Sequence, residues 1–220
     1  MRAERAAHLT YPPAMPLDLA SLVAPGHTAV LTIEVQQDVV GEGSILPDLA
    51  AAATTMVPKV AELLRAARAA GVVVAHATAE SRPDRLGSSS NARLFMATAK
   101  RRQPGAPGPA PKAVLHPGLG AEPADLVMPR MHGLSALYDT GLDAALRNAG
   151  VTTIVVTGVS VNVAVLSTVM DAVNRSYQVV IPRDAVAGVG AEYVEAVLDN
   201  TLSLLATLTT TDDLIATWSA

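Results

Sequence analysis

Short apolar runs rich in β-branched residues recur along this chain, separated by segments whose apolar residues are spaced as in helices. Runs of this kind suit strands that are buried on both faces of a parallel sheet. Because parallel strands are joined by crossover helices, such helices cover both faces. We therefore expect an α/β fold of three αβα layers with a mostly parallel, six-stranded, Rossmann-like sheet. The expected strands are residues 28–35, 72–77, 126–129, 152–158, 178–181 and 206–209.

Helices are expected in the intervals between these strands. The longest should cover residues 47–70, where apolar residues recur at helical spacing from Val57 to Leu64 and Gly71 provides a stop. The other expected helices cover about residues 140–148, 162–175, 191–202 and 211–218.

The chain is expected to form one domain over residues 1–220, since a chain of this length can build a single packed core. Residues 1–26 are expected to be an N-terminal arm. Residues 81–123 differ from the rest because prolines and glycines crowd the stretch 102–111. We interpret 81–123 as an excursion or lid over the sheet rather than as a linker.

Charge and composition limit the partners of the chain. Its net charge is −4, and its only basic run, Lys100–Arg102, is too short for the positive surface that binds nucleic acid or an anionic membrane. The first residues lack the apolar core of a signal peptide, and no apolar run reaches the ~18 residues of a membrane span. We expect a cytoplasmic protein whose partner is a small-molecule substrate.

The chain contains no cysteine, which excludes disulfides, thiolate metal sites and covalent thiol catalysis. Its five histidines are scattered without the paired spacing of a zinc site. We therefore expect neither a metal nor a cofactor.

Several polar residues fall where the expected strands end, and ligands of α/β sheets bind at the carboxyl ends of strands. Glu34 ends a buried strand, where a carboxyl group suits general acid or base catalysis; the alternative is a salt-bridged structural carboxylate. Arg130 is its candidate partner, since a guanidinium can grip a carboxylate or stabilise developing negative charge. His132 either orients substrate or is inert. His76 is expected to be a satisfied group at a strand end.

Gly158 follows the best strand pattern and permits a sharp turn into the next helix. The first N–H groups of a helix lack partners within it and favour an anion. Backbone N–H groups around Val161 and Ala164 are therefore candidates to bind a substrate carboxylate or an oxyanion.

Four segments resemble the isochorismatase-like hydrolase superfamily, which includes nicotinamidases, N-carbamoylsarcosine amidases, ureidoacrylate and biuret amidohydrolases, and the isochorismatases proper. Leu31–Gln36 resembles the family's strand ending in Asp-Met-Gln, and Ser135–Leu142, Gly158–Ala172 and Val179–Ala185 are similar to further family segments. The resemblance spans about residues 30–211. It implies an isochorismatase-like fold and a hydrolase.

In family members that use a thiol, the resemblance implies a catalytic aspartate, lysine and cysteine. The aspartate position matches Glu34, the lysine position falls at Arg130 or Met131, and the cysteine position is Ala164. Because alanine cannot attack a substrate, the resemblance implies a branch that lacks the catalytic cysteine.

The resemblance also implies a cis peptide bond that helps to form the oxyanion hole, expected here between Ser160 and Val161. The isochorismatases proper likewise lack the cysteine, and they hydrolyse a vinyl ether with a carboxylic acid and water. They commonly have histidine where Asn162 stands. Together these arguments give Gln36, His132, Ser160, Val161 and Asn162 as the candidate substrate-binding residues.

Three hypotheses follow. The favoured one is a thiol-independent hydrolase of a small carboxylated or amide substrate, with Glu34 as acid or base and water as nucleophile. The second is a catalytically silent member that keeps its pocket as a ligand-binding or assembly module. The third is an engineered cysteine-to-alanine variant of a cysteine amidohydrolase, which the concerted departures at Glu34, Arg130 and Ala164 disfavour. Family analogy predicts a homodimer or homotetramer.

Overall fold

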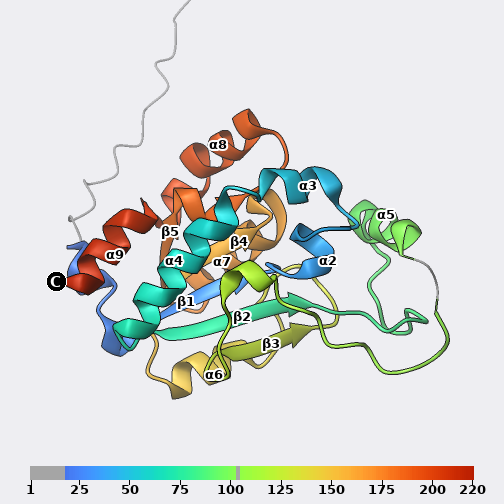
Figure 1. Ribbon diagram of the computed structural model, residues 1–220, viewed down its shortest axis with the longest axis horizontal. Coiled ribbons are helices and arrows are strands. Elements are labelled where there is room, and N and C mark those ends of the chain that lie inside the picture. The colour runs from blue at the N-terminus through green and yellow to red at the C-terminus, as the bar shows by residue number, and fades with distance from the viewer. Residues whose placement is uncertain (1–17, 103–104) are drawn as a thin grey trace, which may run out of the picture.

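The computed structural model describes residues 18–102 and 105–220, and a parallel sheet forms the centre of this part (Figure 1). Six strands lie in the order β3-β2-β1-β4-β5-β7, and a short strand, β6, pairs with β4. All these pairings are parallel. The strands are β1 (Thr28–Ile33), β2 (Val73–Ala79), β3 (Leu126–Arg130), β4 (Thr153–Val159), β5 (Gln178–Pro182), β6 (Val186–Ala187) and β7 (Thr207–Thr209).

The α/β class and each of the expected strands are confirmed, but the expected count of six strands is wrong because β6 adds a seventh. β6 consists of Val186 and Ala187 alone, directly after a 3-10 turn. Two residues are too few to show the periodicity of a strand, so no pattern in the sequence marks this element.

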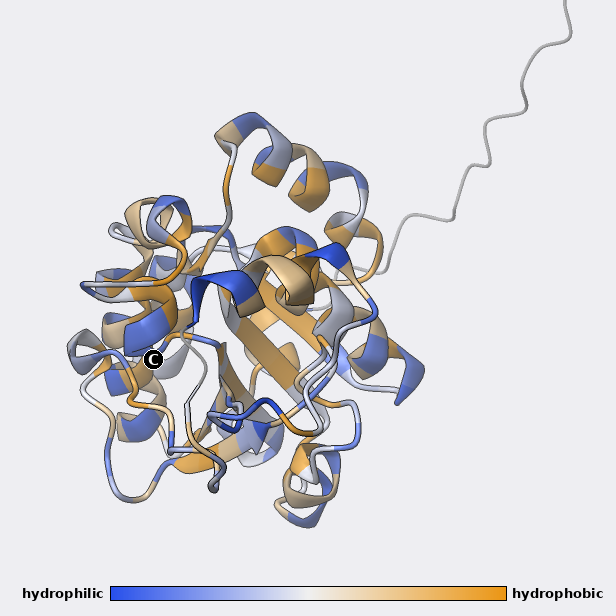
Figure 2. Cartoon of the chain, turned by 90° about the vertical axis from the view of Figure 1, so that its right-hand side faces the viewer, coloured by the Kyte–Doolittle hydropathy of each residue, from blue (hydrophilic) through white to orange (hydrophobic). Residues whose placement is uncertain are grey.

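Helices cover both faces of the sheet, and Figure 2 shows the apolar strands between them. Successive β1 residues point to opposite faces: Val30 joins the apolar cluster of α4 and α9, and Leu31 joins that of α6, α7 and α8. All residues of β1 are buried, as expected for a central strand. These helices are α4 (Met56–Ala69), α6 (Leu142–Asn148), α7 (Leu166–Asn174), α8 (Ala191–Asn200) and α9 (Thr211–Ser219).

The single helix expected over residues 47–70 is two helices, α3 (Pro47–Ala52) and α4. The break falls just before Pro58, which has no N–H to donate within a continuous helix. Since α4 begins at Met56, Pro58 lies in the first turn, where the N–H groups have no intrahelical acceptor. The remaining short helices are α1 (Leu19–Leu22), α2 (Gln37–Val40), the π-helix Val161–Val165, and the 3-10 turns Pro25–His27, Pro117–Leu119, Arg183–Ala185 and Leu202–Leu204.

The expected excursion over residues 81–123 leaves the carboxyl end of β2 and carries α5 (Arg93–Arg101), which lies beyond the sheet edge (Figure 1). It returns along the segment that follows β1, where Leu115 bridges Gln36. Residues 103–104 of the excursion and 1–17 of the expected arm lie outside the described residues. Within the described part, no helix is long and apolar enough to span a membrane.

Candidate active site

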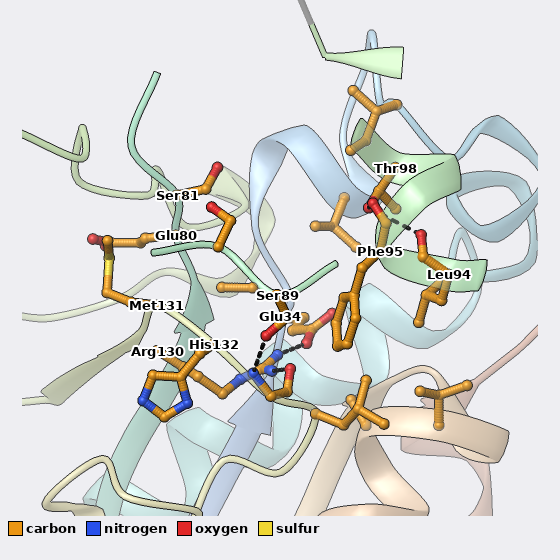
Figure 3. A pocket seen from close by; sticks show the side chains of 18 of the residues that line it. Glu34, Glu80, Ser81, Ser89, Leu94, Phe95, Thr98, Arg130, Met131 and His132 are labelled. Atoms are coloured by element: carbon orange, nitrogen blue, oxygen red, sulfur yellow. Dashed lines mark hydrogen bonds and ion pairs between the residues drawn. The ribbon is translucent and has the colours of Figure 1, made fainter. Parts of the chain in front are cut away.

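Glu34 is the first residue after β1 and lines a cavity at the carboxyl edge of the sheet (Figure 3). Its φ of 54° lies in the left-handed region, which residues other than glycine rarely adopt. The N–H of Glu34 donates to the carbonyl of Ala77 at 2.9 Å and so ties this conformation to β2. The chain thereby turns out of the strand, and a strained backbone of this kind often marks a functional position.

Gln36 fixes the segment that follows Glu34. Its amide nitrogen donates to the carbonyl of Ala79 at 2.9 Å, and its amide oxygen accepts the N–H of Ala79 at 2.8 Å. The same nitrogen also contacts a carboxylate oxygen of Asp38 at 2.7 Å. With its side chain occupied in this way, Gln36 holds the loop after β1 against β2.

Arg130 ends β3 and forms an ion pair with Glu34, as expected from the sequence. Its Nη2 contacts Glu34, and its Nη1 donates to the carbonyl of Gly133 in the loop that follows β3. Arg130 is only 7 % exposed. A charge so buried depends on its partner, so the pair couples the end of β1 to the loop after β3.

The turn after β4 is built on Gly158, whose φ is 103°. A Cβ at this position would lie 2.3 Å from the carbonyl oxygen of Ile33, so only glycine fits against β1. A cis peptide bond joins Val159 to Ser160. The expected position, between Ser160 and Val161, is therefore wrong by one residue. Val161 is already the first residue of the helix, and Ser160 is the extended residue that precedes it.

The helix that follows opens with one π turn, Val161–Val165, instead of the regular helix expected from the sequence. The carbonyl of Ser160 accepts the N–H groups of Val163 at 3.0 Å and Val165 at 3.1 Å. Such wide turns are frequent at functional sites. Here the turn contains Ala164, which is nearly buried and lines the cavity.

Thr168 connects the π turn to the loop after β3. Its hydroxyl donates to the carbonyl of Ala164 at 2.7 Å and accepts the N–H of Ala136 at 2.9 Å. The loop that carries His132 is thus anchored to the helix that carries Ala164.

The cavity measures about 170 Å³, slightly more than the ~150 Å³ that accommodates benzene in an engineered core. α5 extends over it, and Phe95 points from α5 into the cavity (Figure 3). Its apolar wall consists of Val39, Ile45, Leu46, Leu49, Leu94, Phe95 and Val163. Its charged and polar lining includes Glu34, Glu80, Ser81, Arg85, Ser88, Ser89, Arg102, Arg130, His132 and Ser160. The dimensions and the mixed lining suit a small molecule.

Most of the site residues expected from the sequence come together here: Glu34, Arg130, His132, Ser160 and Ala164 line the cavity, as does Met131. The other expected residues lie beside it. Gln36 borders a neighbouring depression, Val161 is fully buried in the core, and the side chain of Asn162 lies near Gly188.

The sequence predicts that the excursion, with Arg85 and Phe95, shapes the pocket, and both residues line the cavity, but sequence reasoning missed Glu80 and the apolar residues outside the excursion. Glu80 follows β2 as Glu34 follows β1, so the same argument about strand ends would have found it. Leu46 and Leu49 carry no such signal, because apolar residues that line a cavity look like core residues in a sequence.

The isochorismatase domain family matches residues 28–213, which contain the whole sheet and the cavity-lining residues described above. The chain belongs to the isochorismatase family. Solved structures agree: an isochorismatase family protein from Burkholderia thailandensis superposes with a TM-score of 0.72 at 28% identity, covering 89% of this chain and 97% of that one. A cysteine hydrolase from Pseudomonas syringae pv. phaseolicola 1448A gives a TM-score of 0.74 at 25% identity, covering 90% and 95%.

Among curated isochorismatase-family relatives, a ureidoacrylate amidohydrolase from Methylorubrum extorquens is 31% identical over 173 residues, 72% of this chain and 68% of that protein. A ureidoacrylate amidohydrolase from Methylobacterium radiotolerans is 45% identical over 76 residues. That match spans 34% of this chain but only 28% of the relative.

His76 lies apart from this isochorismatase-family cavity, in the middle of β2 rather than at its end, because the strand continues to Ala79. It is satisfied, as expected: Nδ1 lies 2.7 Å from the hydroxyl of Thr32, and Nε2 lies 3.1 Å from a carboxylate oxygen of Asp125. Arg68 holds the same carboxylate at 2.7 Å. Burial lowers the pKa of His76, although Asp125 acts in the opposite direction. Across residues 18–102 and 105–220, no three His, Asp or Glu side chains are grouped to hold a metal ion.

Proposed function

We propose that this protein hydrolyses a small carboxylated or amide substrate without a thiol, with Glu34 as acid or base and water as nucleophile. The observation that carries the proposal is the ion pair of Glu34 and Arg130 in the wall of a cavity that Ala164 also lines. Family membership supports a hydrolase. The name of the curated relatives, ureidoacrylate amidohydrolase, favours cleavage of a C–N bond beside a carbonyl group in a molecule that carries a carboxylate.

In the proposed reaction, the carboxylate of Glu34 accepts a proton from water while the water oxygen bonds to the substrate carbonyl carbon. The resulting tetrahedral intermediate carries negative charge on oxygen, for which the backbone N–H of Ala164 is the proposed donor, because those of Val163 and Val165 already donate to the carbonyl of Ser160. Glu34 then gives the proton to the leaving nitrogen as the C–N bond breaks. The products are an amine and an acid.

Arg130 has a positioning role in this scheme. A guanidinium stays protonated at all accessible pH values, so Arg130 cannot take part in proton transfer as a lysine can. Its two contacts instead fix Glu34 relative to the Gly133 loop. Of the two members of this ion pair, only Glu34 can transfer a proton.

Water takes the place of the thiol in this proposal. The chain has no cysteine, and the family resemblance puts Ala164 at the cysteine position. Ala164 lines the same cavity as Glu34 and has no atom that can attack a substrate, so the proposed nucleophile is a water molecule in the cavity.

A second candidate function is ligand binding without turnover. It is favoured by the same ion pair, because a guanidinium bound to Glu34 competes with water for the carboxylate. In this second candidate function the cavity binds a ligand, and Glu34 has only a structural role.

A mass-spectrometric screen of the purified protein separates the two candidates. The panel contains ureido acids, small amides, esters and isochorismate, with pyruvate release as one readout. The hydrolase proposal expects at least one substrate to be consumed by the wild type and not by Glu34→Gln. Saturable thermal stabilisation by panel members, with no turnover of any of them, would establish the binding module instead.

A further inference from the structure

The three arginines that line the cavity differ in their partners. Arg130 pairs with Glu34, and Arg102 pairs with Asp38 at 2.6 Å. Arg85 also lines the cavity, and no carboxylate of the described residues forms an ion pair with it. Within the described part of the chain, Arg85 is thus the cationic group of the cavity that an anionic ligand can use.

The loop around Arg85 holds this residue in an unusual conformation. Its φ is 61°, in the left-handed region, and two backbone hydrogen bonds of 3.0 Å fix it: its N–H donates to Arg82 and its carbonyl accepts from Ser88. The adjacent carboxylate, Asp84, is gripped at both oxygens by Arg82, at 2.9 and 2.7 Å. The acidic residue nearest to Arg85 in the sequence is therefore already paired with Arg82, so it does not neutralise the guanidinium of Arg85.

The other charges of the cavity decide where an anion can lie. Glu34 is paired with Arg130 and Asp38 with Arg102, so neither of these pairs offers a free positive charge, and the anionic end of a ligand is favoured close to Arg85. Glu80 already accepts the N–H of Ala113 at 2.9 Å. The apolar wall, with Leu46, Leu49 and Phe95, offers a surface for the hydrocarbon body of the ligand.

We propose that Arg85 binds the carboxylate of the substrate and so selects monoanions with an apolar body. Arg85 can bind the anion whether or not turnover follows. Only the identification of that anion as a substrate rests on the proposed function. A guanidinium holds a carboxylate through charge-assisted and often paired hydrogen bonds, which discriminate strongly against a neutral amide.

The test uses probes that no hydrolase step consumes. 4-Methylpentanoate and phenylacetate are titrated calorimetrically into the full chain, each beside 4-methylpentanamide or phenylacetamide as its neutral counterpart. The variant is Arg85→Asn, because asparagine tolerates a left-handed backbone and lacks the charge. Arg93→Asn is the matched control, an exposed arginine of the same excursion that does not line this cavity. Arg85→Lys, which keeps the charge, provides a second variant should Arg85→Asn fail to fold.

The wild type and Arg93→Asn should bind a carboxylate at least about tenfold more tightly than its amide. Arg85→Asn should lose this preference and leave amide binding within about twofold, and Arg85→Lys should keep part of it. An unchanged preference in Arg85→Asn, or no carboxylate binding by the wild type, would overturn the assignment. Carboxylate binding through Arg85 without turnover of any panel compound would contradict the proposed hydrolase activity but not the role of Arg85. Turnover that is the same in Arg85→Asn and in the wild type would contradict the role of Arg85 but not the proposed hydrolase activity.

Discussion

Arg130 and Glu34 form an ion pair across 96 residues of chain. Arg130 ends β3 and Glu34 follows β1, so the guanidinium reaches across the end of β2. This contact joins two chain segments that the sheet itself does not pair. Both side chains are largely shielded from water, so neither charge has a good alternative partner in solvent.

The energetic coupling of this pair can be measured by a double-mutant cycle of Glu34→Gln, Arg130→Gln and the double variant, unfolded in urea. Each single variant leaves the other group buried without its partner and should lose stability, Arg130→Gln by about 2 kcal/mol. The double variant should recover part of that loss, with an interaction energy of about 1–3 kcal/mol. Strict additivity of the two losses would contradict the coupling.

Ala164 can be tested by introducing a unique thiol, since the chain has no cysteine of its own. Ala164→Cys should react with iodoacetamide because residue 164 lines the cavity, and phenylacetate should slow the reaction. Ala172→Cys is the matched control, on the same chain segment but fully buried in the core. Equal labelling of the two variants, read by intact mass, would show that residue 164 is not accessible from the cavity.

The buried His76 predicts a pH dependence of stability. Its pKa in the folded protein is below the ordinary value of 6.5, chiefly because of burial, so the unfolded chain binds a proton that the folded protein does not. The free energy of unfolding is therefore highest above pH 6.5 and should fall as the pH decreases below it, by up to about 1.4 kcal/mol per pH unit.

His76→Gln keeps an amide that can donate to Asp125 but removes the titration. Urea unfolding between pH 7.5 and 5 should show a flatter dependence for this variant than for the wild type. Thr32→Val is the control, because it removes the hydroxyl partner and keeps the imidazole, so it should lower stability at all these pH values and retain the slope. The same slope in wild type and His76→Gln would rule out His76 as its source.

Much of the architecture could be predicted because the signals are local. The run Thr28–Ile33 is apolar or β-branched at every position, as suits a strand buried on both faces, and Gly158 marks a backbone approach that no other residue permits. The meeting of Glu34 with Arg130 follows from the parallel direction of the strands, which brings their carboxyl ends to one edge.

The remaining features depend on contacts that local patterns do not encode. The cis bond between Val159 and Ser160 and the π turn that follows it have no local signal in the sequence. The apolar wall combines Leu46 and Leu49 with Leu94 and Phe95 of α5, which are far apart in the sequence. Each of these requires the packed chain.

The most direct test of the account is the turnover number of Glu34→Gln on whichever panel compound the wild type hydrolyses, measured alongside the affinity for phenylacetate. Removal of the proton-transferring carboxylate should lower kcat by about 100-fold or more, while the affinity changes little. A kcat close to that of the wild type, in a variant that is folded and binds the ligand, would contradict the assignment of Glu34 as the acid or base.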